Sequence, residues 1–142
     1  MRENAASFGT VSTTAGLYDI QITTYREEGY AIGERHPKVR LIQDIDSDLS
    51  RRDFTVNSIA LSGSEIVDPY NGREDLKKKI IRCVGDPAQK MNDDPLRIVR
   101  AYRLVSSYGL NIDPLVDKAM QSSIDLLQIV STERLAEEFR RN

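Results

Sequence analysis

The sequence predicts an α+β protein in which a mixed part and a helical part follow one another along the chain. Before about residue 85, runs of β-branched and aromatic residues alternate with short helical patterns. From Asp86 onward, apolar residues recur at helical spacing to the end of the sequence. The 142 residues are 39% hydrophobic, which is enough for one core. We therefore expect a mixed sheet with helices over residues 1–85 and an all-α region over residues 86–142.

The elements of the first part are predicted from alternation, turn residues and helix-start signals. Residues 8–13 and 17–25 flank Ala15-Gly16, which predicts two paired strands with a tight turn. Residues 27–47 are polar with two glycines and a proline, which is typical of an excursion from a sheet. Acidic residues followed by apolar ones predict a helix over residues 46–60. The remaining segments are a strand at 65–68, a basic helix at 73–79 and a strand at 80–84.

Proline and glycine divide the helical part. Asp94 before Pro95 predicts a helix start, because a carboxylate caps free backbone N–H groups and proline has none to lose. Gly109 is expected to end this helix as its C-cap. The predicted helices cover residues 86–92, 95–108, 114–128 and 132–142. Leu135 and Phe139 call for an apolar partner, so we expect the chain to be incomplete at its C-terminal end.

Charge and cysteine content exclude several classes of protein. The formal net charge is −2, so contact with RNA would have to come from local basic patches. One cysteine, Cys83, and one histidine, His36, cannot form an internal disulfide or a Cys/His zinc cluster. No apolar run approaches about 18 residues, and the N-terminus lacks the apolar core of a signal peptide. We expect a cytoplasmic protein that does not contact a membrane; the pattern specifies no oligomeric state.

Two clusters of charged residues are candidates for a binding site. On a helical projection, Asp93, Arg97 and Arg100 share one face, which is either a solvated surface with ordinary ion pairs or a rigid set of donors and acceptors for a planar polar ligand such as a nucleobase. In the predicted helix 46–60, Asn57 lies one turn beyond Asp53. That helix face is either a surface ion-pair network or a clamp for a ribose hydroxyl and a phosphate.

Arg51, Arg52 and Asp53 follow one another in the predicted helix 46–60. Successive helical residues point about 100° apart, so these three residues cannot all serve one partner.

A third cluster is basic. The basic residues after the Asp68-Pro69 turn form a compact patch, which is either a solvated helix face or a contact for an RNA backbone. These residues are Arg73, Lys77, Lys78, Lys79 and Arg82.

Four stretches taken together resemble one family. They are RRDFTVNSIAL (51–61), IVDPYNGREDL (66–76), DDPLRIVRAYRL (93–104) and STERLAEEF (131–139). In this order and spacing they resemble the class II tRNA nucleotidyltransferases and bacterial poly(A) polymerases. The resemblance implies the C-terminal part of a nucleotidyltransferase head over residues 1–85 and a helical neck, incomplete at its C-terminus, over residues 86–142.

The resemblance also implies an activity and its reactants. Members add CMP and AMP, taken from CTP and ATP, to the 3′ end of a tRNA and release pyrophosphate with the help of Mg²⁺. By this resemblance Asp94 and Arg97 read the incoming base, and Asp93 and Arg100 belong to the same motif. The partners would be nucleoside triphosphates and a tRNA or RNA 3′ end.

The resemblance assigns further roles outside base recognition. Arg52 and Asp53 match the motif that holds the ribose and selects NTP over dNTP. The structural motifs of the family match at Asp68 and Gly72, which link head and neck, and at Glu133 and Arg134, which support the neck.

The metal-binding residues of the family are the main departure. The family has an Asp-x-Asp pair upstream of the first strand stretch, and this sequence has none there. Asp44-Ile45-Asp46 has the same Asp-x-Asp pattern but follows the strands. Gln21 stands where the family often has an acidic residue, and the nearest carboxylate, Asp19, has the same strand parity. We therefore expect base and ribose recognition without metal binding, and no nucleotide transfer by this chain alone.

Three other interpretations remain open from the sequence. One is a poly(A) polymerase of the same family, which would use ATP and ignore CTP. Another is a nucleotide-binding or RNA-binding module without catalysis, in which the Asp-x-Asp pair is natively absent. The last is a structural domain whose charges are all solvated.

Overall fold

The computed structural model describes residues 10–15, 18–23 and 45–141, and its contacts divide the chain into two compact units, residues 1–45 and 46–142. In the first unit, β1 (Thr10–Ala15) pairs antiparallel with β2 (Tyr18–Thr23). Thr10 lies opposite Thr23 and Ala15 opposite Tyr18, so the predicted hairpin is confirmed. Its first strand lies two residues later than predicted, and its second strand lies within the predicted bounds. Most of the predicted excursion at 27–47 lies outside the described residues.

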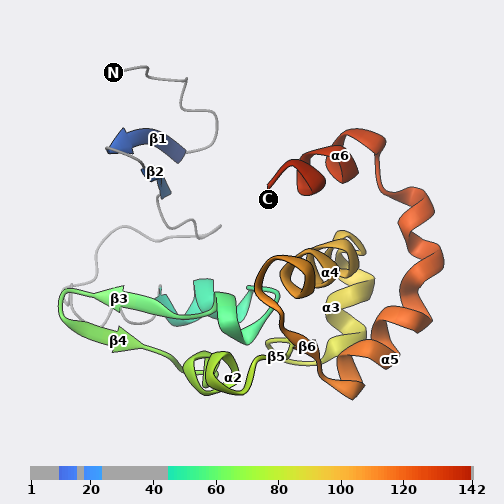
Figure 1. Ribbon diagram of the computed structural model, residues 1–142, viewed down its shortest axis with the longest axis horizontal. Helices are drawn as coiled ribbons and strands as arrows, with labels where there is room; N and C mark the ends of the chain where they lie inside the picture. The colour runs from blue at the N-terminus through green and yellow to red at the C-terminus, as the bar shows by residue number, and fades with distance from the viewer. Residues whose placement is uncertain (1–9, 16–17, 24–44, 142) are drawn as a thin grey trace, which may run out of the picture. The chain divides into compact units, whose positions relative to one another are not determined.

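The second unit contains the strands and helices after residue 45 (Figure 1). Residues 45–50 are helical and are followed by a 3-10 turn, η1 (Thr55–Asn57). The next elements in order are β3 (Ala60–Ser62), β4 (Glu65–Val67), α2 (Gly72–Lys78) and β5 (Ile80–Ile81). The C-terminal elements are α3 (Pro87–Asp93), α4 (Leu96–Tyr108), β6 (Asn111–Ile112), α5 (Pro114–Ser123), η2 (Ile124–Ile129) and α6 (Thr132–Arg140).

The predicted helix over residues 46–60 is wrong beyond residue 50. Phe54 forms an isolated β-bridge with Cys83, and the Thr55 N–H donates to the Arg82 carbonyl at 2.9 Å. The Asp53 carboxylate also accepts from the adjacent Phe54 N–H, which offers the backbone an alternative to the helix. An aromatic and β-branched run favours this extended pairing, so the chain leaves the helix and pairs with a segment about 30 residues away.

The strands are short and form three two-stranded sheets among the described residues. β3 pairs antiparallel with β4, as a hairpin. β5 pairs in parallel with β6, a strand that the sequence analysis did not predict. The predicted strand at 80–84 thus divides its contacts between β6 and Phe54.

The predicted helices of the C-terminal part are confirmed in position. Asp86 caps α3 by accepting from the Gln89 N–H at 3.0 Å, and Ser131 caps α6 by accepting from the Arg134 N–H at 3.3 Å. Gly109 ends α4 with a φ of +64°, the left-handed conformation that favours glycine. The predicted helix 114–128 is α5 continued by the 3-10 turn η2.

One hydrophobic core joins the strand segments to the helices. Phe54 and Ile81, both without exposed surface, pack with Met91, Ile98 and Met120. α3 lies against α4 and α5, and α6 returns to contact α4 (Figure 1). This core places the turn at residues 51–53 beside the N-terminal half of α4. Among the described residues no helix is both long and apolar enough to cross a membrane.

Candidate functional site

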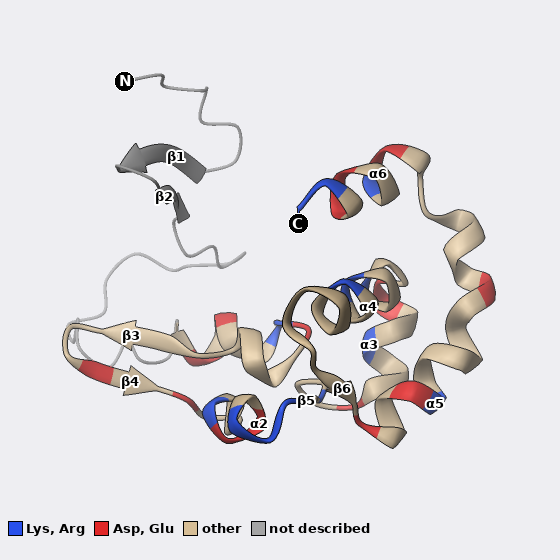
Figure 2. Cartoon of the chain, in the orientation of Figure 1, with Lys and Arg blue, Asp and Glu red and all other residues tan. Residues whose placement is uncertain are grey.

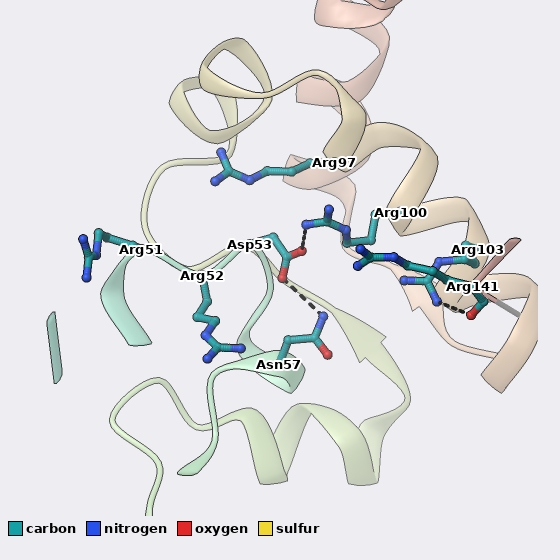
Figure 3. Close-up of a pocket in the computed structure, with 8 residues that line it drawn as sticks. All are labelled: Arg51, Arg52, Asp53, Asn57, Arg97, Arg100, Arg103 and Arg141. Carbon is teal, nitrogen blue, oxygen red and sulfur yellow. Dashed lines mark hydrogen bonds and ion pairs between the residues drawn. The ribbon is translucent and has the colours of Figure 1, made fainter. Parts of the chain in front are cut away.

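A pocket of about 440 Å³ lies between the 51–57 segment and α4 (Figure 3). The lining residues are Arg51, Arg52, Asp53, Asn57, Arg97, Arg100, Arg103 and Arg141. Six of these eight are arginines and one is an aspartate. A wall of guanidinium groups focuses positive potential on the pocket and favours an anionic ligand.

Asp53 is the one carboxylate in this lining, and it is 6% exposed. Its Oδ1 accepts from the Phe54 N–H at 2.7 Å and from Asn57 Nδ2 at 3.2 Å. Its Oδ2 accepts from Arg100 Nη1 at 2.7 Å (Figure 3). Both carboxylate oxygens therefore have partners inside the protein, and Asp53 holds the pocket wall together.

Arg100 connects this wall to α6. Its Nε and Nη2 donate to the two Glu138 carboxylate oxygens at 3.2 and 3.3 Å, while Nη1 bonds Asp53. Arg103 Nε also donates to Glu138, at 3.0 Å. Burial alone would lower the pKa of Arg100, but the hydrogen bonds that it donates to Glu138 and Asp53 raise it. Arg100, predicted as part of the base-reading motif, thus has its donors engaged by two buried carboxylates.

Glu138 was not singled out from the sequence. It is 2% exposed, and although burial alone would raise its pKa, hydrogen bonds from Arg100 and Arg103 lower it. A signal was present, because Glu138 lies three residues after the apolar Leu135 and so shares its helix face. A carboxylate on the inward face of an amphipathic helix calls for a cationic partner.

Arg97 has a different environment from Arg100. Its Nη1 donates to the Lys90 carbonyl at 2.7 Å, and its buried Nε has no hydrogen-bond partner in the described part of the chain. No carboxylate among the described residues pairs with it within 4.0 Å. Arg97 extends from α4 over the turn that carries Asp53 (Figure 3). Arg97 therefore lines the pocket with a guanidinium group that no described carboxylate neutralises.

The face predicted to carry Asp93 beside Arg97 and Arg100 is not formed. Asp93 is the last residue of α3 and accepts from Gln89 Nε2 at 2.7 Å, whereas Arg97 and Arg100 belong to α4. Proline disfavours helical geometry in the residue before it, so Asp94 adopts an extended conformation that separates the two helices. Asp93 therefore does not line the pocket.

Asp94 lies at the junction of α3 and α4. Its Oδ1 accepts from the Leu96 N–H at 3.3 Å, as the predicted helix start requires, although α4 begins one residue later than predicted. Arg134 Nη2 donates to both of its carboxylate oxygens, at 3.2 and 3.1 Å. The Asp94 side chain is 25% exposed and that of Arg134 is 53% exposed, so this is a surface ion pair.

The turn at residues 51–53 is held from a second side by Lys90 of α3. Lys90 Nζ donates to the Ser50 and Arg52 carbonyls, both at 3.0 Å. Burial and the charge of Arg97 lower the pKa of Lys90. The Arg52 side chain itself is 51% exposed and pairs with Asp48 at 2.9 Å, so its guanidinium can exchange partners at low cost.

Asp94, Arg134 and the other residues singled out from the sequence lie outside the pocket lining. Asp68 caps α2 by accepting from the Gly72 and Arg73 N–H groups at 2.7 and 3.0 Å. A Cβ at Gly72 would overlap the Thr55 carbonyl, so glycine is required where α2 meets η1. Glu133 lies exposed in the first turn of α6. Gln21 is in β2 opposite Ser12.

Magnesium needs several oxygen ligands around one point. The described residues contain no group of three or more aspartate, glutamate, histidine or cysteine side chains that could hold a metal ion. Asp46 is exposed on the helix at 45–50, and Asp44 lies outside the described residues. The described carboxylates therefore do not fit a Mg²⁺ site.

The chain is similar to several known proteins. It is 43% identical over 133 residues to a CCA-adding enzyme of Lactobacillus helveticus, covering 92% of this chain and 33% of that protein. The CCA-adding enzyme of Bacillus stearothermophilus, solved with CTP, has 34% identity and a TM-score of 0.73 over 92% of this chain and 31% of that one. The Thermotoga maritima CCA-adding enzyme, solved with tRNA-CCA, has 27% identity and a TM-score of 0.70 over 94% of this chain and 30% of that one.

These relatives are longer than this chain, which spans about a third of their length. A family model described as the poly A polymerase head domain matches residues 1–82, more than half of the 142 residues. The family predicted from the four sequence stretches is confirmed by this match. The chain belongs to the poly A polymerase head-domain family.

Proposed function

We propose that this chain is the nucleotide-recognition part of a tRNA nucleotidyltransferase that adds CMP and AMP, from CTP and ATP, to the 3′ end of tRNA with release of pyrophosphate. The observation that carries the proposal is the pocket walled by six arginines. Its volume of about 440 Å³ is in the usual range for small-molecule sites. Guanidinium groups match phosphate geometry, and a nucleoside triphosphate is a ligand of suitable size and charge.

Base recognition is assigned to Arg97 and Asp94. The Arg97 guanidinium lines the pocket and has no carboxylate partner among the described residues, so it can donate to a ring nitrogen or carbonyl oxygen of a base. The Asp94 carboxylate can accept from the exocyclic amino group that cytosine and adenine share, exchanging part of its exposed pair with Arg134. Uracil and guanine present a carbonyl instead, and an unpaired polar group typically costs about 1 to 3 kcal/mol.

Ribose and phosphate recognition is assigned to Arg52, Asp53 and Asn57. Both carboxylate oxygens of Asp53 have partners, so its role in this proposal is to orient Asn57, from whose Nδ2 it accepts a hydrogen bond. The Asn57 Oδ1 remains available to accept from a ribose hydroxyl, since the structure shows no partner for it in the described part. Arg52, at the exposed rim, can leave Asp48 for a phosphate oxygen.

In this proposal residues 1–85 are the C-terminal part of the head and residues 86–142 begin the neck. Mg²⁺ would be held by the Asp-x-Asp pair that the family has upstream of the first strand, where this sequence has none, so the chain alone is expected not to transfer nucleotides. A reducing compartment such as the cytoplasm suits a chain with one cysteine. Burial and the Asp53 carboxylate raise the pKa of Cys83 to about 11, so its thiol stays protonated.

The direct test is calorimetric titration of the chain with CTP, ATP, UTP and GTP. We expect CTP and ATP to bind at least about tenfold more tightly than UTP and GTP, as one lost polar contact implies. Arg97→Ala should remove most of this preference, whereas Arg140→Ala, a matched change at an exposed arginine outside the pocket lining, should keep it.

The same titration separates the alternative functions. Binding of ATP without CTP would indicate a poly(A) polymerase. Equal binding of all four nucleotides would contradict base reading and leave a phosphate site alone. Transfer of CMP by this chain to a tRNA lacking CCA would contradict the assignment of metal binding to residues outside it.

A further inference from the structure

Glu138 is the least exposed charged side chain among the described residues, at 2%, and it does not line the pocket. It comes from α6, while both of its partners, Arg100 and Arg103, come from α4 and do line the pocket. Ion pairs reach 3.2 Å to Arg100 Nε and 2.9 Å to Arg103 Nη2. One buried carboxylate thus orients two of the guanidinium groups of the site.

The contacts continue from Glu138 to the opposite wall. Arg100 binds Glu138 through Nε and Nη2 and uses Nη1 to bind Asp53. Asp53 in turn accepts from Asn57 Nδ2. The side chains form an unbroken path from α6 to η1, although Glu138 and Asp53 are far apart in sequence. Figure 3 shows the part of this path that runs from Arg100 through Asp53 to Asn57.

Without Glu138, the balance of charge between these walls changes. Arg100 and Arg103 would be left with the single carboxylate of Asp53 nearby. Like charges repel, so the two guanidinium groups would move apart or turn toward the pocket. Arg100 would then no longer hold Asp53 in one orientation, and Asn57 would lose the partner that fixes its amide.

We propose that Glu138 is a positioning residue for ribose recognition: it holds Arg100 against Asp53 and thereby fixes Asn57 for the ribose hydroxyls of the nucleotide. This inference rests on the proposed nucleotide-binding function. Two properties of the site then have different origins, namely the attraction of the triphosphate and the discrimination of ATP from dATP. Attraction of the triphosphate depends on the positive charge of the pocket, whereas discrimination of ATP from dATP depends on the path that starts at Glu138.

The test is calorimetric titration of the chain, and of Glu138→Gln, with ATP, dATP and inorganic triphosphate. The wild-type chain should prefer ATP to dATP by about tenfold, the effect of one hydrogen bond to a ribose hydroxyl. In Glu138→Gln this preference should fall below about threefold. Inorganic triphosphate should bind at least as tightly as before, because the substitution removes one negative charge beside the pocket. A merely structural role would weaken all three ligands in proportion.

The charge-matched control is Glu137→Gln. Glu137 lies one residue away, its side chain is 63% exposed, and it pairs with Arg141 at the pocket rim. This variant also removes one negative charge near the pocket, but it leaves the path from Arg100 to Asn57 intact. It should keep the preference for ATP over dATP. Equal loss of preference in both variants would overturn the proposal.

A second variant, Glu138→Asp, tests the proposal if Glu138→Gln does not fold. Glu138→Asp keeps the charge but is one methylene shorter, so it cannot reach both arginines, and an intermediate preference is expected. An unchanged preference in the folded variant would overturn the proposal. If the wild-type chain binds ATP and dATP equally, this inference fails while nucleotide binding stands; if it binds neither, the proposed function fails and the inference with it.

Discussion

The turn at residues 51–53 and the junction at residues 93–97 each place an aspartate beside arginines, but the two aspartates differ in burial. The Asp53 side chain is 7% exposed and bonds Arg100 at 2.7 Å, whereas that of Asp94 is 25% exposed and pairs with a half-exposed Arg134. Breaking a buried pair typically costs about 3 to 5 kcal/mol, and an exposed pair about 0 to 1 kcal/mol. The turn therefore builds the pocket wall, while the junction can exchange its partner for a ligand.

The largest effect is expected at the buried aspartate. Asp53→Ala removes the acceptor of the Phe54 N–H and one partner of Arg100, so we expect a loss of about 3 kcal/mol in the free energy of unfolding. Urea denaturation followed by circular dichroism measures it. Asp48→Ala, which breaks the exposed pair with Arg52, is the control and should cost less than about 1 kcal/mol. Equal losses in both variants would remove the distinction between buried and exposed pairs.

A somewhat smaller effect is expected where α2 supports the same wall. Gly72→Ala would drive a Cβ into the Thr55 carbonyl, and overpacking of this kind costs about 2 kcal/mol. At Gly63, by contrast, an added Cβ meets no atom within 4 Å and only the φ of +61° is unfavourable. Gly63→Ala should therefore cost about 1 kcal/mol. Thermal unfolding of both variants measures the difference, and a smaller loss at Gly72 would contradict the close approach.

The acid dependence of stability isolates the buried network. The pKa of Glu138 is lowered in the folded state from its ordinary value of 4.5, so its contribution is complete above pH 4.5. That contribution is lost as the pH falls through the lower, folded-state pKa. Glu138→Gln should therefore reduce the slope of unfolding free energy against pH on the acid side. An identical slope in wild type and variant would mean that Glu138 is not held by Arg100 and Arg103.

The smallest effect is expected at Asp94, the more exposed of the two aspartates. Arg134→Gln removes the partner of Asp94, and because both groups are partly solvated the free energy of unfolding should change by less than about 1 kcal/mol. Urea denaturation of this variant beside Asp53→Ala gives the comparison directly. A loss as large as that of Asp53→Ala would show that the junction, too, is part of the wall.

Local signals predicted those parts of the fold that depend on neighbouring residues. The caps at Asp86 and Ser131 and the end of α4 at Gly109 are set within a few residues, so the sequence pattern was sufficient for them. The helix predicted over 46–60 failed because Phe54 pairs with Cys83, a contact that no local pattern records. β6 is two residues long, too short for any periodicity.

In the candidate site, too, local patterns predicted the residues but not their long-range contacts. Arg97 and Asp53 were found from residue type and spacing, but the sequence could not show that Arg97 keeps an unpaired donor while both carboxylate oxygens of Asp53 have partners. Asp93 was grouped with Arg97 on a helical projection, although the helix was predicted to start at Pro95 and Asp93 lies before that start. Glu138 was missed because its partners are on α4, more than 30 residues earlier, and only the folding of α6 onto α4 brings them together.

The central claim is that Arg97 is the open donor of the pocket and Arg100 a fixed part of its wall. The most direct test follows the Nε–H resonances of the ¹⁵N-labelled arginines by NMR during titration with ATP, with Arg97→Lys and Arg100→Lys used for assignment. We expect the Arg97 resonance to shift until binding is saturated, while that of Arg100, which is bonded to Glu138, stays in place. A shift of the Arg100 resonance with an unchanged Arg97 resonance would contradict it.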